Sequence, residues 1–308
     1  MIDQHLQHED WDEAPEEMAF EAPYGAIIDE TASLVASLLR SEEAVDAVAS
    51  VATAASVATA ASATTVASVA TATKALRLYV LAPALVNVML NYKICVEHDL
   101  PLHPTVYYEL AESRRYKMDH PIADLDLANR LYASSIELAR SAYRLDPGFG
   151  ERVAAFKARL PGEITRFVYT GGRDRYSWRG AEPTKLERLA KKIRASYSPS
   201  LMVAAAHGAI MPGLLLAEYL DLPLYFVRFS MFKRKDEAPI LSVSDEVWLS
   251  SWRDESVLLF DEDVAKGTTL ELFCRRLAPC FREAKNACCI RHAGSSFVPD
   301  FVSEYWWD

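Results

Sequence analysis

Residues 257–270, VLLFDEDVAKGTTL, join an apolar run to three consecutive carboxylates and a loop of small residues. The four apolar residues predict a buried strand, and Asp261, Glu262 and Asp263 follow it directly. Carboxylates at the end of a buried strand are costly unless they meet a metal, a hydroxyl or a cation. Residues 265–269 then lead into a helical pattern, so backbone N–H groups and a helix N-terminus can converge on an anion. The stretch therefore predicts acceptors for sugar hydroxyls or a hydrated cation beside a cup for a phosphate.

The surrounding sequence predicts the elements that position this loop. From about residue 166, short apolar runs (LMVAAA, LPLYFVRFS, VLLF, ACCIRH) alternate with helical patterns such as KLERLAKKIRASY and IMPGLLLAEYLDL. This alternation indicates an α/β fold with a parallel sheet and crossover helices. EVWLSS, residues 246–251, is a further candidate strand. Ligands of such sheets bind at the carboxyl ends of the strands, where His207-Gly208 and Asp261-Glu262 fall.

The stretch 257–270 resembles the phosphoribosyl diphosphate (PRPP) binding motif of type I phosphoribosyltransferases. The resemblance extends over about residues 176–308, where a helix, a strand, a loop, a helix and a strand follow in the family's order. It implies a parallel sheet flanked by helices, preceded here by a mainly helical N-terminal region. It also implies transfer of 5-phosphoribosyl from PRPP to a nitrogen acceptor, release of diphosphate, and Mg²⁺ as the cofactor.

The same resemblance assigns roles to individual residues. Asp261 and Glu262 would bind the ribose hydroxyls and hold Mg²⁺ indirectly. The loop that wraps the 5′-phosphate would comprise Ala265, Lys266, Gly267, Thr268 and Thr269. The diphosphate loop would comprise His207, Gly208 and Ala209. A mobile catalytic loop would bring basic residues to the diphosphate, namely Arg228, Lys233, Arg234 and Lys235.

The C-terminal residues 289–308, CIRHAGSSFVPDFVSEYWWD, are similar to the end of 6-oxopurine phosphoribosyltransferases, particularly the xanthine-guanine type. A purine-like acceptor is implied, with Arg291 on its exocyclic oxygen and Trp306 or Trp307 stacked on the ring. An alternative of equal weight is that these tryptophans pack in the core of the protein.

Two departures from the family pattern weaken the enzymatic interpretation. Ala265 replaces an Asp that assists proton transfer in those enzymes, and His207 makes contact with diphosphate dependent on pH. A non-catalytic PRPP- or nucleotide-binding regulator on the same scaffold is therefore the alternative function. A third hypothesis is an unrelated doubly wound protein with an accidental match.

The charge of the 308-residue chain is uneven, with a net value of −10. Residues 1–46 hold thirteen Asp or Glu and a single basic residue, Arg40, which predicts an acidic, flexible leader. This acidity argues against nucleic-acid binding, because phosphate contacts need concentrated Lys and Arg. The leader is expected to be dispensable for PRPP binding.

Three further segments follow the leader. Residues 47–73 are a low-complexity hexad repeat of Ala, Ser, Thr and Val, long enough to span a bilayer but too poor in large apolar residues to favour insertion. Residues 74–165 predict a helical domain, in which Pro83 kinks or starts a helix. Residues 166–308 form the predicted phosphoribosyltransferase-like domain.

The five cysteines are odd in number and show no CxxC spacing, and the chain begins with acidic rather than basic and apolar residues. These features disfavour a disulfide framework, a zinc site and a secretory signal, and they favour a cytoplasmic protein. His98, His103 and His120 are too scattered to predict a metal site. PRPP and a nitrogen-containing acceptor are the expected ligands, and a homodimer is implied by the family resemblance alone.

Overall fold

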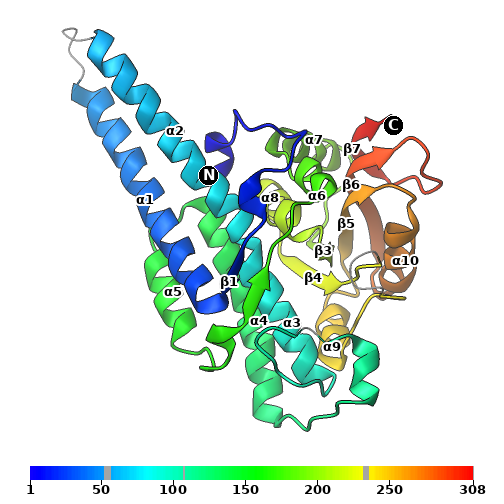
Figure 1. The fold of residues 1–308 in the computed structure, drawn as a ribbon. Coiled ribbons are helices and arrows are strands. Elements are labelled where there is room, and N and C mark those ends of the chain that lie inside the picture. The colour runs from blue at the N-terminus through cyan, green and yellow to red at the C-terminus, as the bar shows by residue number, and fades with distance from the viewer. Residues whose placement is uncertain (52–56, 107, 232–235, 308) are drawn as a thin grey trace.

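The computed structural model describes residues 1–51, 57–106, 108–231 and 236–307. A five-stranded sheet lies in the C-terminal half, with the strand order β4-β3-β5-β6-β7 and every neighbouring pair parallel (Figure 1). The strands are β3 Leu201–Ala206, β4 Leu224–Arg228, β5 Ser256–Val264, β6 Glu283–His292 and β7 Phe301–Trp306. The predicted α/β class with a parallel sheet is confirmed.

Helices surround this sheet because amphipathic segments separate its apolar strands. They are α6 Arg175–Gly180, α7 Pro183–Arg194, α8 Ile210–Leu220, α9 Val243–Ser250 and α10 Thr268–Leu277, with a short 3₁₀ helix η5 Ala278–Cys280. Helix α7 buries Leu186, Leu189 and Ile193 and exposes its charged residues apart from Lys185, which is also buried. The strand predicted at EVWLSS is wrong, because Ser242 and Asp245 form a capping box that begins α9 there.

The connections of the sheet create a switch point between β3 and β5. The chain leaves β3 through α8 and reaches β4 on one side, whereas it leaves β5 through α10 and reaches β6 on the other. Because β3 and β5 are direct neighbours, the loops after them border one crevice at the carboxyl edge. Ligands of open α/β sheets bind at such a point.

The N-terminal region is mainly helical, as predicted. Figure 1 shows α1 Tyr24–Val51 and α2 Val57–Leu81 as a long antiparallel hairpin that projects from the body of the molecule. The other helices are α3 Pro83–Glu97, α4 Ile122–Arg144 and α5 Phe149–Lys157, with 3₁₀ helices η3 Leu110–Arg114 and η4 Ile164–Arg166. Pro83 begins α3, and the hexad repeat lies on α1 and α2 apart from residues 52–56, which are outside the described residues.

One described stretch, Val69–Glu97, is long and apolar enough to cross a membrane by length and composition. Its apolar window is entirely buried inside the structure, as in a core helix. Helix α3, which ends this stretch, packs against α4 and α8. The apolarity of the stretch is therefore accounted for by the core that joins the helical region to the sheet.

Residues 1–46 are not a flexible leader, and this prediction is corrected. They form η1 Ile2–His5, η2 Glu16–Met18, β1 Glu21–Pro23 and most of α1. Ile2, Leu6 and Tyr24 are buried in a core that is continuous with that of the sheet. The prediction relied on the many acids and did not take account of the few apolar residues that pack inward. Deleting residues 1–73 would therefore expose this core.

The predicted boundary between residues 165 and 166 also does not separate two independent domains. Strand β1 pairs antiparallel with β2 Val168–Thr170, so that Glu21 lies opposite Thr170. The first residues of the chain and the segment that precedes the parallel sheet therefore form one small two-stranded sheet.

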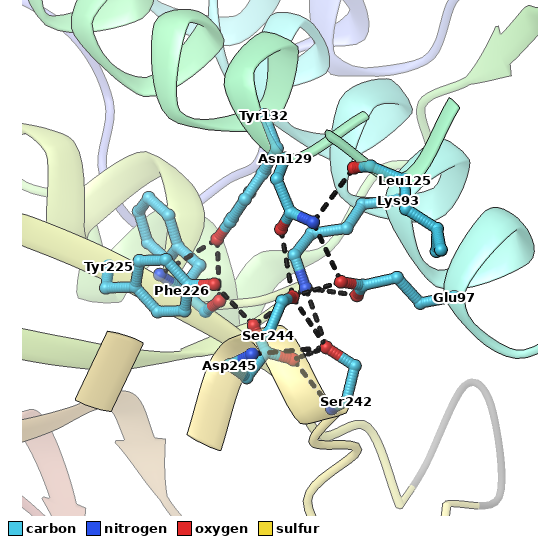
Figure 2. A network of polar contacts seen from close by, with 10 residues as sticks. All are labelled: Lys93, Glu97, Leu125, Asn129, Tyr132, Tyr225, Phe226, Ser242, Ser244 and Asp245. Carbon is cyan, nitrogen blue, oxygen red and sulfur yellow. Dashed lines mark hydrogen bonds and ion pairs between the residues drawn. The ribbon is translucent and has the colours of Figure 1, made fainter. Parts of the chain in front are cut away.

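A buried polar network links the helical region to the α/β region (Figure 2). Lys93 of α3 is 1% exposed and forms ion pairs with Glu97 and with Asp245, the latter at 2.8 Å. It also donates to Ser242 at 3.1 Å, at the start of α9. One ammonium group thus holds two buried carboxylates from different parts of the chain.

The edge strand β4 is covered by a side chain of α4. The hydroxyl of Tyr132 donates to the carbonyl of Phe226 at 2.6 Å and accepts from its N–H at 3.0 Å. Both backbone groups of Phe226 therefore have partners, although β4 has no strand on its outer side among the described residues.

Candidate functional site

The carboxylates of the opening stretch lie near the carboxyl end of β5. Asp261 is 6% exposed, and Glu262 is half-buried. Burial raises the pKa of Asp261 well above its ordinary value, and the neighbouring Glu262 raises it further. Two carboxyl groups held together away from water are unfavourable when ionised. A bound cation or hydroxyl donors would stabilise their charge.

Glu262 reaches across the crevice to the loop after β3. A β-carbon added to Gly208 would lie 1.7 Å from Glu262 Oε1, so only glycine permits this approach. The neighbouring His207 Nδ1 lies 2.7 Å from Asn87 Nδ2 of α3. The structure thus brings together Glu262, His207 and Gly208, three residues that the sequence predicted for one site.

The predicted phosphate loop leads from β5 into α10. Gly267 is the N-cap residue of this ten-residue helix and has a φ of 91°, a left-handed conformation that favours glycine. Ala265, Lys266 and Thr268 are exposed. The first N–H groups of α10 are positioned to meet an anion at this loop.

Gly267→Ala is expected to lower the free energy of unfolding by about 1–3 kcal/mol, because alanine disfavours this φ. The added methyl group would also lie 2.4 Å from Cβ of Phe297. Urea denaturation measures the change. Gly294→Ala is the control, since a β-carbon there meets nothing within 4 Å and should change stability by less than about 0.5 kcal/mol. Equal effects of the two variants would contradict the prediction.

A cavity of about 350 Å³ lies beside His207 and Gly208. Its polar lining includes Asn87, Asn91, Thr105, Thr170, Asp174 and Ser177, and its apolar lining includes Met18, Phe20, Val80, Tyr169, Ile210 and Met211. This volume is in the range of small-molecule sites. Neither Glu262 nor residues 265–269 line it, so the predicted phosphate loop is not part of this cavity.

Of the lining residues, the sequence reasoning named only His207 and Gly208, and it missed Asn87 and Asn91 among the others. Asn87 and Asn91 lie one turn apart on the buried helix α3, and Asn91 Nδ2 donates to Asn87 Oδ1 at 2.8 Å. Two amides with spacing i, i+4 in a largely apolar helix are a signal that could have identified them, because buried amides require partners.

Helix α6 covers the carboxyl edge at Glu262. Ser177 Oγ donates to Glu262 Oε1 at 3.3 Å. A β-carbon on Gly180 would lie 3.1 Å from both Cβ and the carbonyl oxygen of Glu262. In this structure, Glu262 therefore contacts a serine hydroxyl at the position predicted for a sugar hydroxyl.

The residues predicted to bind the acceptor lie at the ends of β6 and β7. Arg291 donates to the carbonyl oxygens of Phe297 at 3.0 Å and Ser295 at 2.7 Å, so it holds the turn between these strands. The ring of Trp306 lies 4.4 Å from the guanidinium carbon of Arg179, whereas Trp307 is 78% exposed. None of the three residues predicted for the acceptor lines the cavity, and their roles stay predictions.

Arg228 ends β4 and is only 2% exposed. Its guanidinium pairs with Asp236 at 3.1 Å and with Glu109 at 3.4 Å. In this structure it stabilises the turn after β4, because Asp236 also accepts from the N–H of Ser230. The predicted role of Arg228 at the diphosphate stays a prediction, and Lys233, Arg234 and Lys235 lie outside the described residues.

Asp263 follows the carboxylate pair and bonds to His292 of β6, with 3.0 Å between Oδ2 and Nε2. Burial raises the pKa of Asp263 to about 6, although His292 opposes the shift. Because the folded pKa is the higher one, the protonated carboxyl contributes stability that is full below the ordinary pKa and is lost as pH rises through about 6.

Asp263→Asn should remove this pH dependence. We expect the variant to gain on the order of 2 kcal/mol of unfolding free energy relative to the wild type between about pH 4 and about pH 7. Urea denaturation across this range measures the difference. Asp254→Asn, at an exposed carboxylate, should show no such trend. A wild type and an Asp263→Asn variant that differ by a constant amount would contradict the assignment.

Magnesium could be held by Asp261 and Glu262. The described residues contain no group of three His, Cys, Asp or Glu that could enclose a metal by themselves. The buried Asp261 and the half-buried Glu262 nevertheless fit Mg²⁺, which keeps several waters and takes few protein ligands when a substrate phosphate is present.

Comparisons with known proteins give matches among solved structures only. No protein-family model and no curated protein matches the chain. A purine phosphoribosyltransferase from Pyrococcus horikoshii is 25% identical, with a TM-score of 0.34, covering 42% of this chain and 86% of its own. A Helicobacter pylori xanthine-guanine-hypoxanthine phosphoribosyltransferase is 18% identical, with a TM-score of 0.31, covering 41% of this chain and 80% of its own.

A third structure, a hypothetical protein from Neisseria gonorrhoeae with bound ppGpp, is 22% identical, with a TM-score of 0.36, covering 41% of this chain and 79% of its own. The first two are phosphoribosyltransferases. The similarity lies in the C-terminal part of the chain.

Proposed function

We propose that the C-terminal region transfers 5-phosphoribosyl from PRPP to a nitrogen acceptor and releases diphosphate. The observation that supports this most directly is the meeting of Glu262 and Gly208 at the switch point between β5 and β3. A carboxylate pair, a glycine loop and the N-terminus of α10 follow these neighbouring strands at the same edge of the sheet, and together they suit a sugar that carries phosphates at two positions.

Each part of the site has a distinct task in this proposal. Asp261 and Glu262 hold the ribose hydroxyls and stabilise the positive charge that develops on the sugar ring as the anomeric C–O bond breaks. Residues 265–269 hold the 5′-phosphate at the start of α10. Residues 207–209 orient the diphosphate leaving group. Bound Mg²⁺ would neutralise charge on that group.

The acceptor is proposed to be a purine-like base or another nitrogen compound of similar size. The cavity beside Gly208 offers Asn87, Asn91 and His207 as hydrogen-bonding groups, and the adjacent rings of Phe20 and Tyr169 contribute to its apolar lining. Because Ala265 supplies no general base, the acceptor is expected to lose its proton to another group or to solvent.

A non-catalytic PRPP- or nucleotide-binding regulator is the second candidate function. Ala265, the closure of α6 over Glu262 and the ion pairs of Arg228 favour it. In both functions the site binds the same sugar phosphate.

We place the protein in the cytoplasm as a homodimer within this proposal, and its five free cysteines suit a reducing compartment.

Binding and turnover separate the two functions. PRPP with Mg²⁺ at about 100 times its Kd should stabilise the fold by about 2.7 kcal/mol, which a thermal shift detects. Diphosphate release with a panel of purine and other nitrogen acceptors should follow if the protein is an enzyme. Stabilisation without release supports the regulator. No stabilisation by PRPP would contradict both functions.

A further inference from the structure

Residues 10–14, DWDEA, lie against α6 and the residues just before it, and we call them the N-terminal strap. Trp178 Nε1 donates to the carbonyl of Asp10 at 2.8 Å. The ring of Trp11 stacks on that of Trp178, with 4.1 Å between centroids and 19° between planes. An aromatic stack and a hydrogen bond therefore fix the strap to the centre of α6.

Three arginines add to this contact. Arg173 Nε donates to the carbonyl of Ala14 at 2.9 Å. Arg175 Nε donates to the carbonyl of Asp12 at 3.0 Å. Arg179 Nη2 donates to the carboxylate of Asp12 at 2.8 Å. The strap thus supplies oxygen acceptors to three guanidinium groups, which are the groups that bind phosphates best.

Arg179 connects the strap to the candidate site. It is 7% exposed, and its Nε has no hydrogen-bond partner among the described residues. Its guanidinium lies over Trp306, and its neighbour Gly180 packs on Glu262. Ser177, on the same short helix, donates to the Glu262 carboxylate. Helix α6 therefore contacts both the strap and Glu262.

We propose that the N-terminal strap is an internal competitor of the sugar phosphate. It holds α6 over Glu262, so that the hydroxyl of Ser177 takes the place of a ribose hydroxyl. The oxygens of the strap accept the hydrogen bonds of the α6 arginines that a phosphate would otherwise accept. Binding of PRPP must then displace α6. The inference rests on the proposed function, because the competitor and the substrate share Glu262.

The test compares Asp12→Ala with Glu16→Ala in the full chain. Asp12→Ala removes the only acidic side chain of the strap that bonds Arg179 in the described residues. Glu16→Ala removes the same charge from an exposed position nearby. Amide hydrogen exchange of residues 175–180 is measured without ligand, and the Kd for PRPP with Mg²⁺ is measured by calorimetry. We expect at least threefold faster exchange and at least threefold tighter binding for Asp12→Ala only.

Each outcome decides the matter. Unchanged exchange in Asp12→Ala overturns the inference, which requires the bond from Arg179 to Asp12 to contribute to holding α6. Faster exchange with an unchanged or weaker PRPP affinity also overturns it, while the proposed function survives. If neither the wild type nor either variant binds PRPP, the proposed function fails, and the competition fails with it.

Discussion

Replacing Asp261 by Asn and Glu262 by Gln together is expected to weaken PRPP–Mg²⁺ binding at least about 100-fold. The amides keep the shape of the carboxyl groups but remove the charge that holds the cation and the acceptors for ribose hydroxyls. Calorimetry at pH 7 measures the loss. Because burial and Glu262 raise the pKa of Asp261, folding at pH 7 opposes ionisation there. The double variant should therefore be as stable as the wild type or more stable.

Two controls make this result specific. Glu271→Gln removes a carboxylate from the exposed face of α10, where it pairs with Arg275, and should leave PRPP binding unchanged. Thermal unfolding of the double variant reports on its fold. If the double variant is stable and binds PRPP as well as the wild type does, Asp261 and Glu262 of β5 are not the PRPP site.

Lys93→Met is expected to lower the free energy of unfolding by about 3–5 kcal/mol, because it leaves Glu97 and Asp245 buried without their cation. The network of Figure 2 joins α3 to the start of α9, so the loss should destabilise both regions together. Urea denaturation followed by circular dichroism measures it. Adding Glu97→Gln to Lys93→Met should recover part of the stability.

Lys117→Met is the matched control for this substitution. Lys117 is 68% exposed and pairs with Asp99 at 3.5 Å, so its removal should cost less than about 1 kcal/mol. Equal losses for the two lysines would show that the buried network contributes no more than a surface ion pair.

The parallel sheet and its carboxyl-edge loops could be predicted because their signals are local. Residues 201–206 and 257–260 are unbroken apolar runs, and the acids that follow the second run stand at a strand end in any parallel sheet. The predicted proximity of Glu262 and Gly208 required only that β3 and β5 be neighbours, which they are. Strand β7 was not predicted, because its outer half carries exposed polar and aromatic residues.

The role of the first residues could not be predicted, because it depends on contacts between distant segments. The bond from Trp178 to Asp10 joins residues 168 positions apart, and no local pattern in DWDEA announces it. High negative charge there is typical of disorder, yet a few apolar side chains such as Ile2 and Leu6 decide the outcome. The covering of Glu262 by α6 was missed for the same reason.

The hydroxyl of Tyr132 has a consequence for assembly between molecules. Strand β4 is an outer strand, and such strands invite a strand from a second molecule to add to them, which leads to aggregation or swapped dimers. An incoming strand would find both hydrogen-bonding groups of Phe226 already taken. Any homodimer of this chain is therefore not expected to form by continuing the sheet past β4.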